Sequence, residues 1–474
     1  MNPSLSPRAV LATVCAGYFI AGWSMAPVSA ILPTITHDLN VPVEGGAWVM
    51  NAYFLVLVGS VLTAGRLGDS VGHGRVFGTG TLIFAAASVI AALMPGFTAL
   101  LAARAAQGLG SALILGSTLA IVAQTFPGNS RAMAVGLLTM TSGFASLAGV
   151  WMSTLLAEGA SWRLAFLIPV PVGIAAAFIA SRYDLVPRRT EPARVDWLSA
   201  FTLFGAVGFL LTGMNHLHDG PETFEAGAPY HVSMHIVSLA LFSAFVYRQL
   251  HMRNPLVRFS LLKNRQLTGG ITANGLAHMS MLATSVLLPF LLERGRDMAP
   301  SDTGRLVLVQ QVFMLFSAVL GGWLYSRRPS FVLALVTMGM MATGLLLLGQ
   351  FGTWLPYALM FPISAMLGAG LGAFTSINNT YVIGLAPADQ RGFVGGLTEL
   401  TRQFGHAIGV SMSSAFLSSA LAAMPGVPGY LMGFSQAATA MGILLAIGLL
   451  GVGAPTRQSH AELSRPVARG VRSA

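Results

Sequence analysis

The sequence predicts an all-α polytopic membrane protein with fourteen transmembrane helices and both termini in the cytoplasm. Three observations lead to this prediction: the composition, a series of long apolar stretches, and the placement of the basic residues between them. Of the 474 residues, 54% are hydrophobic and only 9% are charged, whereas soluble domains carry about 25% charged residues. The chain is therefore too apolar for an ordinary soluble domain.

The apolar stretches are long enough to be helices that cross a bilayer. A helix needs ~20 residues to cross ~30 Å of hydrocarbon, and backbone groups in lipid must bond within their own segment or within a closed barrel. The stretches are too long and too uniformly apolar for barrel strands. The first, from Ala9 to Pro33, is too long for a signal peptide and is predicted to be a retained span. The fourteen stretches begin near residues 9, 46, 75, 98, 132, 163, 196, 232, 267, 303, 330, 355, 392 and 431.

The basic residues fix the predicted orientation. Twenty of the 26 Lys and Arg residues lie at the chain ends or in every second gap between stretches. Basic loops stay on the cytoplasmic side of a membrane, so both termini are expected inside. The net charge of +10 then reflects topology and anionic headgroups, and no nucleic-acid partner is expected. The remaining gaps hold Arg163, Arg294, Arg296 and Arg305, while Arg104 and Arg402 lie inside stretches.

The chain contains an internal repeat: part of its first half matches part of its second half at an offset of about 260 residues. It holds without a gap through one loop and two spans, which chance rarely produces. Spans four and five therefore repeat as spans twelve and thirteen. The matched pairs include Gly108 and Gly368, Gly110 and Gly370, Pro127 and Pro387, Arg131 and Arg391, Gly136 and Gly396, Thr141 and Thr401, Phe144 and Phe404, and Gly149 and Gly409.

The repeat predicts how the chain is divided. Residues 1–190 and 263–455 are expected to form two parallel six-helix halves, 191–262 two inserted helices with their linkers, and 456–474 a basic cytoplasmic tail. Parallel halves that rock around a central site are typical of secondary transporters. No nucleotide-binding loop of the G-x-x-x-x-G-K-[ST] type occurs, so ATP is not expected to drive the protein directly.

Several motifs, taken together and in order, carry a resemblance to a known family. The loop after span two runs from Gly65 to Arg75 as G-R-L-G-D-S-V-G-H-G-R, span four holds R-A-A-Q-G-L-G from Arg104, and span thirteen holds T-R-Q-F-G from Thr401. In these features the chain resembles the major facilitator superfamily, in its fourteen-span drug:proton antiporter branch. The resemblance covers nearly the whole chain. It implies a central cavity reached alternately from each side.

Two departures from the branch bear on proton coupling. The branch carries an acid in span one, where this chain has Ser24, and the span-five signature G-P-x-x-G-G keeps only its first glycine, Gly149. Both losses weigh against proton antiport of cationic drugs and leave the expected fold unchanged.

The inner-loop motif is expected to form a gate. Its glycines, Gly65, Gly68 and Gly72, allow a sharp turn between two helices, and Asp69 can cap a helix or pair with a cation on a neighbouring span. Arg75 closes the motif. Positions 70, 73 and 74 lack the basic residues usual in the family, so the charge latch is thinner here.

Glu399 is the acid expected to carry a proton, because it alone of the sixteen acids lies well inside a predicted span. Arg402 and His406 follow at i+3 and i+7 on the same helical face, and His278 lies near the middle of span nine. Charged groups inside membranes are costly and commonly functional. The alternative is that Glu399 and Arg402 form a structural ion pair near the inner gate.

Other polar residues inside spans are candidates for the substrate cavity. Arg104 could serve substrate, proton or packing, and Asn378 and Asn379 could bind substrate or bridge helices. Asn274, Asn51 and Ser24 are weaker candidates of the same kind.

No metal site or cofactor is expected. Cys15 is the only cysteine. Histidines 216, 218, 231 and 235 and Asp219 lie in or near one outer loop, and although such spacings can bind a transition metal, exposed interfacial histidines are far commoner.

The sequence thus predicts an inner-membrane secondary active transporter, not an enzyme, that exports amphipathic small molecules against proton entry. Its expected partners are that substrate, protons and the lipid bilayer, with a monomer as the expected state and a periplasmic adaptor protein left open. Two rivals remain: a proton-independent or lipid and metabolite carrier of the same fold, and a polytopic membrane enzyme or sensor.

Overall fold

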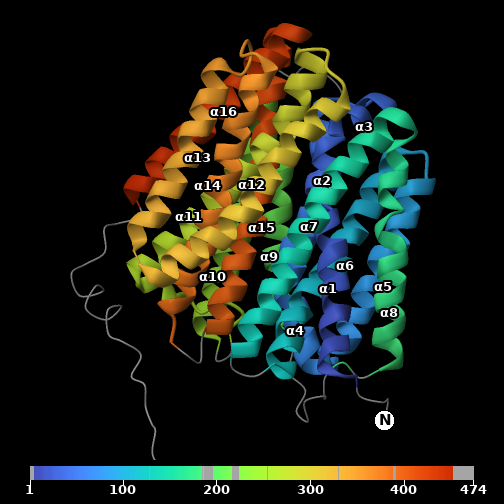
Figure 1. Ribbon diagram of the computed structural model, residues 1–474, viewed down its shortest axis with the longest axis vertical. Helices are drawn as coiled ribbons and strands as arrows, with labels where there is room; N and C mark the ends of the chain where they lie inside the picture. The colour runs from blue at the N-terminus through green and yellow to red at the C-terminus, as the bar shows by residue number, and fades with distance from the viewer. Residues whose placement is uncertain are drawn as a thin grey trace, which may run out of the picture.

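The computed structural model describes residues 5–126, 129–183, 185, 196–215, 224–252, 255–328, 330–387 and 391–451. These ranges contain fourteen helices long and apolar enough to cross a membrane, which confirms the predicted number of spans, and the described part contains no strand. The predicted starts agree with the observed helices to within a few residues. The longer helices are α1 (Pro7–Trp23), α4 (Val43–Val71), α5 (His73–Leu93), α6 (Phe97–Thr125), α7 (Asn129–Gly159), α8 (Pro169–Arg182), α9 (Trp197–Met214), α10 (Phe224–His251), α11 (Arg265–Pro289), α12 (Pro300–Arg327), α13 (Phe331–Phe351), α14 (Tyr357–Gly384), α15 (Arg391–Ala423) and α16 (Val427–Gly451) (Figure 1).

The first span is broken, where the sequence suggested one continuous helix. After α1 ends at Trp23, the chain continues as the short helices α2 (Ala26–Ala30) and α3 (Leu32–Asp38). Pro27 and Pro33 lie in the first turns of α2 and α3. Proline has no N–H to donate and disfavours a helical residue before it, so each proline starts a new segment. The break leaves the Ser24 carbonyl free to accept a bond from elsewhere.

The two halves repeat the same packing. In the N-terminal half α1 packs on α7, α4 on α6, and α5 on α6 and α8; in the C-terminal half α11 packs on α15, α12 on α14, and α13 on α14 and α16. A side chain at Gly108 of α6 would collide with the Tyr53 carbonyl of α4, and one at Gly368 of α14 with the Gln310 carbonyl of α12. The glycine pair that marks the sequence repeat thus performs the same close approach in both halves.

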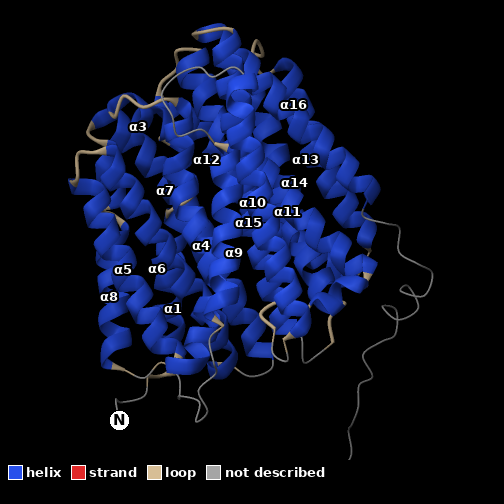
Figure 2. Ribbon diagram, turned by 180° about the vertical axis from the view of Figure 1, so that it is seen from behind, coloured by secondary structure: helices blue, strands red, loops and turns tan. Residues whose placement is uncertain are grey.

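The two inserted helices bridge the halves. α9 packs against α4 of the first half and α15 of the second, and α10 packs against α9; Figure 2 shows α9 and α10 near the middle of the molecule, between the two groups of helices. The predicted boundaries at residues 190 and 262 place α9 and α10 in the insert. The division into halves and insert stays a prediction. The predicted tail, 456–474, lies outside the described residues.

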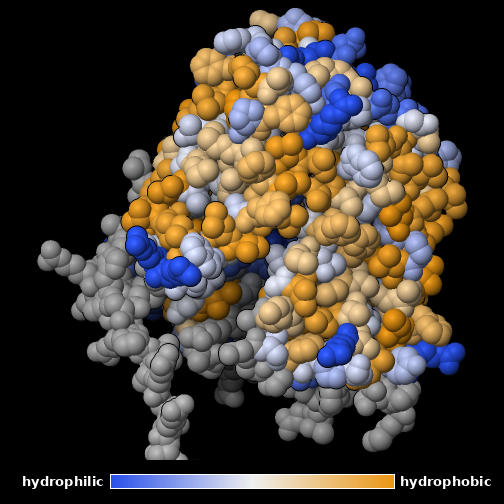
Figure 3. All heavy atoms as spheres, in the orientation of Figure 1, coloured by the Kyte–Doolittle hydropathy of each residue, from blue (hydrophilic) through white to orange (hydrophobic). Residues whose placement is uncertain are grey.

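One end of the molecule is open and the other is closed. A hollow opens toward the end at which α1 begins, between α7 and the C-terminal half (Figure 3). At the opposite end the halves touch: Arg294 Nη2 donates to the Pro33 carbonyl at 3.2 Å, and the Ser301 amide donates to Glu158 Oε2 at 3.2 Å. If basic loops mark the cytoplasm, the open end faces inward.

Candidate functional site

Glu399 lies on α15, at the boundary between the two halves. It forms an ion pair with Arg402 and accepts a hydrogen bond from Gln403 Nε2 at 2.7 Å. The side chains of Glu399 and Arg402 remain 21% and 30% exposed, so the pair borders an open space and is not sealed in the core. Tyr18 of α1 interacts electrostatically with both. The pair therefore faces the N-terminal half.

From Glu399 a chain of polar groups leads into the C-terminal half. His406 Nδ1 lies 3.3 Å from Gln403 Oε1, and His406 Nε2 lies 3.2 Å from His278 Nδ1 on α11. His278 Nε2 lies 3.4 Å from the Thr375 hydroxyl on α14. Both imidazoles are buried. Imidazole and hydroxyl groups can each accept and donate protons, so a proton can pass between His406, His278 and Thr375. The Gln403 amide joins these groups to Glu399 by hydrogen bonds and does not itself carry a proton.

The structure thus brings together the four residues proposed for proton coupling. Sequence reasoning missed Gln403 and Thr375. Gln403 could have been found from its i+4 spacing to Glu399, whereas Thr375 is on another helix and carried no signal of its own.

Arg104 is fully buried, and its hydrogen-bond partners all lie within the N-terminal half. Its Nε donates to the Val49 carbonyl at 2.8 Å, its Nη1 to Gln107 Oε1 at 2.7 Å, and its Nη2 to the Ser24 carbonyl at 3.1 Å. Its guanidinium also lies 4.7 Å from the centre of the Tyr53 ring. These contacts tie α4 and the break in span one to α6, so the packing alternative for Arg104 has direct support.

Tyr53 connects the two networks. Its ring contacts Arg104, its hydroxyl donates to Ser111 Oγ at 3.0 Å, and it interacts electrostatically with Glu399 across the boundary. No sequence pattern distinguishes Tyr53 from other tyrosines, which are common in packed helices.

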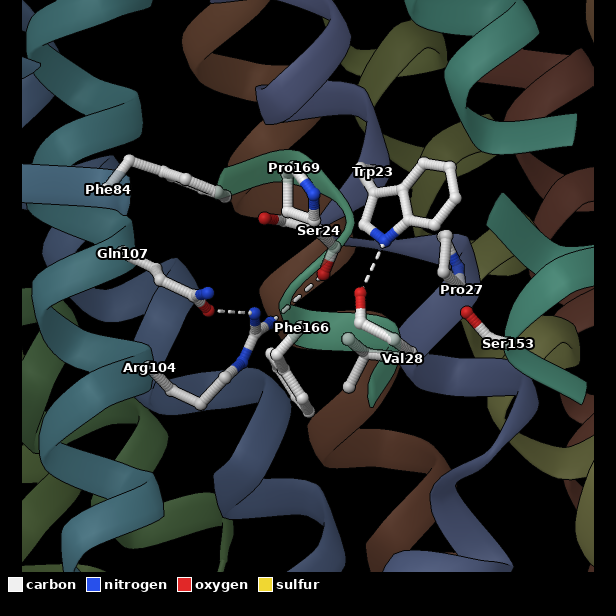
Figure 4. A pocket seen from close by; sticks show the side chains of 11 residues that line it. Trp23, Ser24, Pro27, Val28, Phe84, Arg104, Gln107, Ser153, Phe166 and Pro169 are labelled. Atoms are coloured by element: carbon white, nitrogen blue, oxygen red, sulfur yellow. Dashed lines mark hydrogen bonds between the residues drawn. The ribbon is translucent and has the colours of Figure 1, made fainter. Parts of the chain in front are cut away.

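A small pocket lies beside Arg104. It is partly open and is lined by aromatic and aliphatic side chains together with Arg104, Gln107, Ser24 and Ser153 (Figure 4). Trp23 lies at its edge and donates through Nε1 to the Ala165 carbonyl at 2.9 Å. The Ser153 hydroxyl is buried and has no hydrogen-bond partner among the described residues. The pocket could receive one small polar group.

The cavity asparagines mainly join helices. Asn274 Nδ2 donates to the Thr398 carbonyl at 2.9 Å, and Asn378 Nδ2 donates to the Gly270 carbonyl at 3.1 Å. Asn51 Nδ2 donates to Ser411 Oγ at 2.9 Å. In the described part of the chain the side-chain oxygens of Asn274, Asn378 and Asn379 are buried without a partner, so these residues retain acceptors that a ligand or water could use.

The inner-loop motif makes a turn of one residue. α4 ends at Val71, Gly72 has a φ of 104°, and α5 begins at His73. This left-handed conformation favours glycine. Asp69 Oδ1 lies 3.2 Å from His73 Nε2, so its partner on the neighbouring span is a residue that is cationic only when protonated. A side chain at Gly68 would collide with the His73 ring.

The outer-loop histidines do not form a metal site in the described residues, which contain no group of three possible ligands. His231 Nδ1 lies 2.5 Å from the Gly213 carbonyl and His235 Nδ1 lies 2.6 Å from the His231 carbonyl. His216, His218 and Asp219 lie outside the described residues.

Comparison with protein families gives a match over most of the chain. Residues 14–410 match the family described as Major Facilitator Superfamily. The riboflavin transporter RibZ of Clostridioides difficile is 26% identical over 87% of this chain and 88% of its own length. The tetracenomycin C resistance and export protein of Streptomyces glaucescens is 27% identical over 87% of this chain and 76% of its own length. The multidrug transporter protein MdtP of Bacillus subtilis is 23% identical over 83% and 72%.

Solved structures share the fold. A bacterial homolog of the human lysosomal transporter Spinster, in an inward-facing and unoccupied conformation, aligns with a TM-score of 0.67 at 14% identity, over 94% of this chain and 96% of that one. The nucleoside transporter NupG aligns with a TM-score of 0.66 at 11% identity, over 94% and 100%. These proteins are transporters, not enzymes.

Proposed function

The chain belongs to the major facilitator superfamily, and from this premise we propose that it exports amphipathic small molecules across the inner membrane in exchange for protons. Fourteen apolar helices and transporter relatives make it a multi-pass membrane protein that moves small molecules. The efflux proteins among the relatives support the outward direction. Proton coupling is the finer part of the proposal.

The chain of polar groups from Glu399 to His278 is the observation that carries proton coupling. Glu399 is partly exposed, so water can reach its carboxyl group, and contacts of 2.7, 3.3 and 3.2 Å lead from it through Gln403 and His406 to His278. Tyr18 of α1 lies near the Glu399–Arg402 pair, so a ligand that binds the pair could compete with Tyr18. A ligand that engages Arg402 or displaces Tyr18 would change the affinity of Glu399 for its proton.

The test is proton release on ligand binding by the purified protein in detergent. Ethidium, tetraphenylphosphonium, riboflavin and a neutral polycyclic phenol are the ligands. Wild-type protein is expected to release about one proton per bound ligand, and Glu399→Gln to bind without release. Asp297→Asn is the matched control, because Asp297 is an exposed acid remote from the chain of polar groups. Equal release by Glu399→Gln and wild type would leave Glu399 as a structural residue.

A proton-independent metabolite carrier is the second candidate. Two observations favour it: Ser24 stands where the branch carries its span-one acid, and a riboflavin transporter is among the relatives. Riboflavin binding without proton release, and riboflavin transport that survives collapse of the pH gradient, would support this candidate over the first.

A further inference from the structure

A second carboxyl group inside a span lies at the closed outer end. Glu293 belongs to η3 (Phe290–Gly295), a π-helical turn that continues α11; such turns often occur at functional sites. Its Oε1 lies 3.5 Å from the Thr303 hydroxyl of α12, and the Thr34 side chain of α3 lies near it. Within the described residues, no basic nitrogen lies close enough to form a salt bridge with it.

The neighbouring residue closes the gate. Arg294 donates to the Pro33 carbonyl of the opposite half at 3.2 Å. Glu293 and Arg294 therefore lie where α3 of the N-terminal half meets η3 and α12 of the C-terminal half. Opening the outer end would separate Thr34 from Glu293 and Pro33 from Arg294.

Most other titratable groups around η3 are engaged with partners other than Glu293 or are exposed. On α3, Asp38 pairs with Arg163, and on α12, Asp302 pairs with Arg305. Directly after η3, Arg296 donates to the Leu355 carbonyl at 2.9 Å and Asp297 is exposed. His37 on α3 is exposed as well, and the ring of Tyr430 of α16 stacks on Phe290. Arg294 is the charged group that acts electrostatically on Glu293.

We propose that Glu293 is a second proton-binding site, and that its neutral form holds the outer gate closed. Burying a carboxylate without a paired cation is costly, and protonation removes that cost. When the outer end opens, water can solvate the charged form. A proton arriving from outside would then favour closure of the outer gate and inward opening, which is the step an exporter driven by proton entry requires. The inference rests on the proposed proton coupling.

Polar side chains also lie along α11 between His278 and Glu293. Ser280 and Thr284 are two of these, and with Gln310 of α12 they line a small pocket. The Ser280 hydroxyl is buried without a partner in the described part of the chain. Buried polar groups of this kind commonly hold water.

The test measures the outer gate directly and needs no substrate. Spin labels are placed at His37→Cys on α3 and Met424→Cys directly after α15, two exposed positions on opposite halves, in a Cys15→Ser background. Neither position removes a partner of Asp302. Distances between the labels are measured by electron paramagnetic resonance in nanodiscs across the pH range. Labelling position 37 also removes the nearby histidine as an alternative sensor.

With Glu293 intact, the distance is expected to increase as the pH rises, and Glu293→Gln should keep the short distance at every pH. Glu293→Asp should restore the response, and Asp297→Asn should behave like the parent. Thr303→Val, which removes a hydroxyl partner and keeps the carboxyl, should displace the midpoint while Thr303→Ser does not. A response that persists in Glu293→Gln, or no response in the parent, would overturn the proposal.

Failure of proton coupling itself is measured separately. If the wild-type protein binds ligand without releasing a proton, the proposed function fails, whatever the gate distances show. If release depends on Glu399 but the gate ignores Glu293, only the second site is wrong.

Discussion

Individual polar residues in this protein fall into two groups according to whether their bonds are complete. Each side-chain nitrogen of Arg104 already donates to an acceptor within its own half, so Arg104 does not need a ligand to satisfy its hydrogen bonds. Arg402 keeps a buried Nε without a partner among the described residues, and Glu399 beside it is partly exposed. This difference in bonding supports the proposal that Glu399 and Arg402 take part in transport while Arg104 holds helices together.

A prediction at the residue scale concerns Asp38. Hydrogen bonds from Arg163, at 2.6 Å, and from Trp162, at 3.0 Å, hold the pKa of the Asp38 carboxyl below its ordinary value. A lowered pKa stabilises the folded protein at neutral pH, and this contribution is lost as the pH falls through the folded-state value, below about 4. The side chain is 47% exposed, so the contribution is only about 0.2–1 kcal/mol.

Asp38→Asn should therefore lower thermal stability slightly at pH 7, and the deficit should shrink as the pH falls below about 4. The measurement is thermal unfolding in detergent as a function of pH, with Asp297→Asn as a control that should match wild type throughout. A deficit that stays constant with pH would show that the ion pair is not its cause.

Helices in this fold approach one another through small residues, since lipid supplies no hydrophobic force between them. The C-terminal half shows this clearly: Gly368 and Gly372 of α14 place their backbone against carbonyls of α12. The same device at Gly108 in the first half explains why the glycines survive in the repeat. The glycines matched in the sequence repeat thus lie at equivalent helix contacts in the two halves.

A prediction at the element scale follows for α14. Gly368→Ala should destabilise the protein by about 1–3 kcal/mol, because the added methyl group collides with the Gln310 carbonyl and forces the helices apart. Gly384→Ala, on the same helix, meets nothing within 4 Å and should be neutral or stabilising. Thermal unfolding of the two variants provides the comparison, and equal losses would refute the close-approach argument.

Across the whole molecule, a single serine joins the three parts of the chain. Ser411 of α15 accepts hydrogen bonds from Asn51 of α4 at 2.9 Å and from Asn215, at the end of α9, at 2.8 Å. All three side chains are buried. The two halves and the insert therefore share this buried polar contact.

Ser411→Ala should cost about 1–3 kcal/mol, because it removes the acceptor of the buried Asn51 amide and one of the two acceptors of the buried Asn215 amide, which keeps the Leu211 carbonyl. Ser418→Ala is the matched control on α15, since the Ser418 hydroxyl donates only to the Ser414 carbonyl of its own helix. Thermal unfolding is again the measurement. If both variants lose the same stability, the contact between the parts contributes nothing beyond a local bond.

The sequence by itself determined the number of spans, the repeat and the family, and it predicted the side of each loop. Hydrophobic length, loop charge and motif order are local properties of the chain and need no contacts between distant residues. It also placed Glu399, Arg402 and His406 on one helical face, since that follows from the 3.6-residue period. Only the tertiary structure decided that His278 meets His406, that Tyr18 faces Glu399, and that Glu293 sits at a closed gate. Those contacts join helices far apart in sequence, and their register depends on how glycines, prolines and buried amides pack, which no periodic pattern along one helix records.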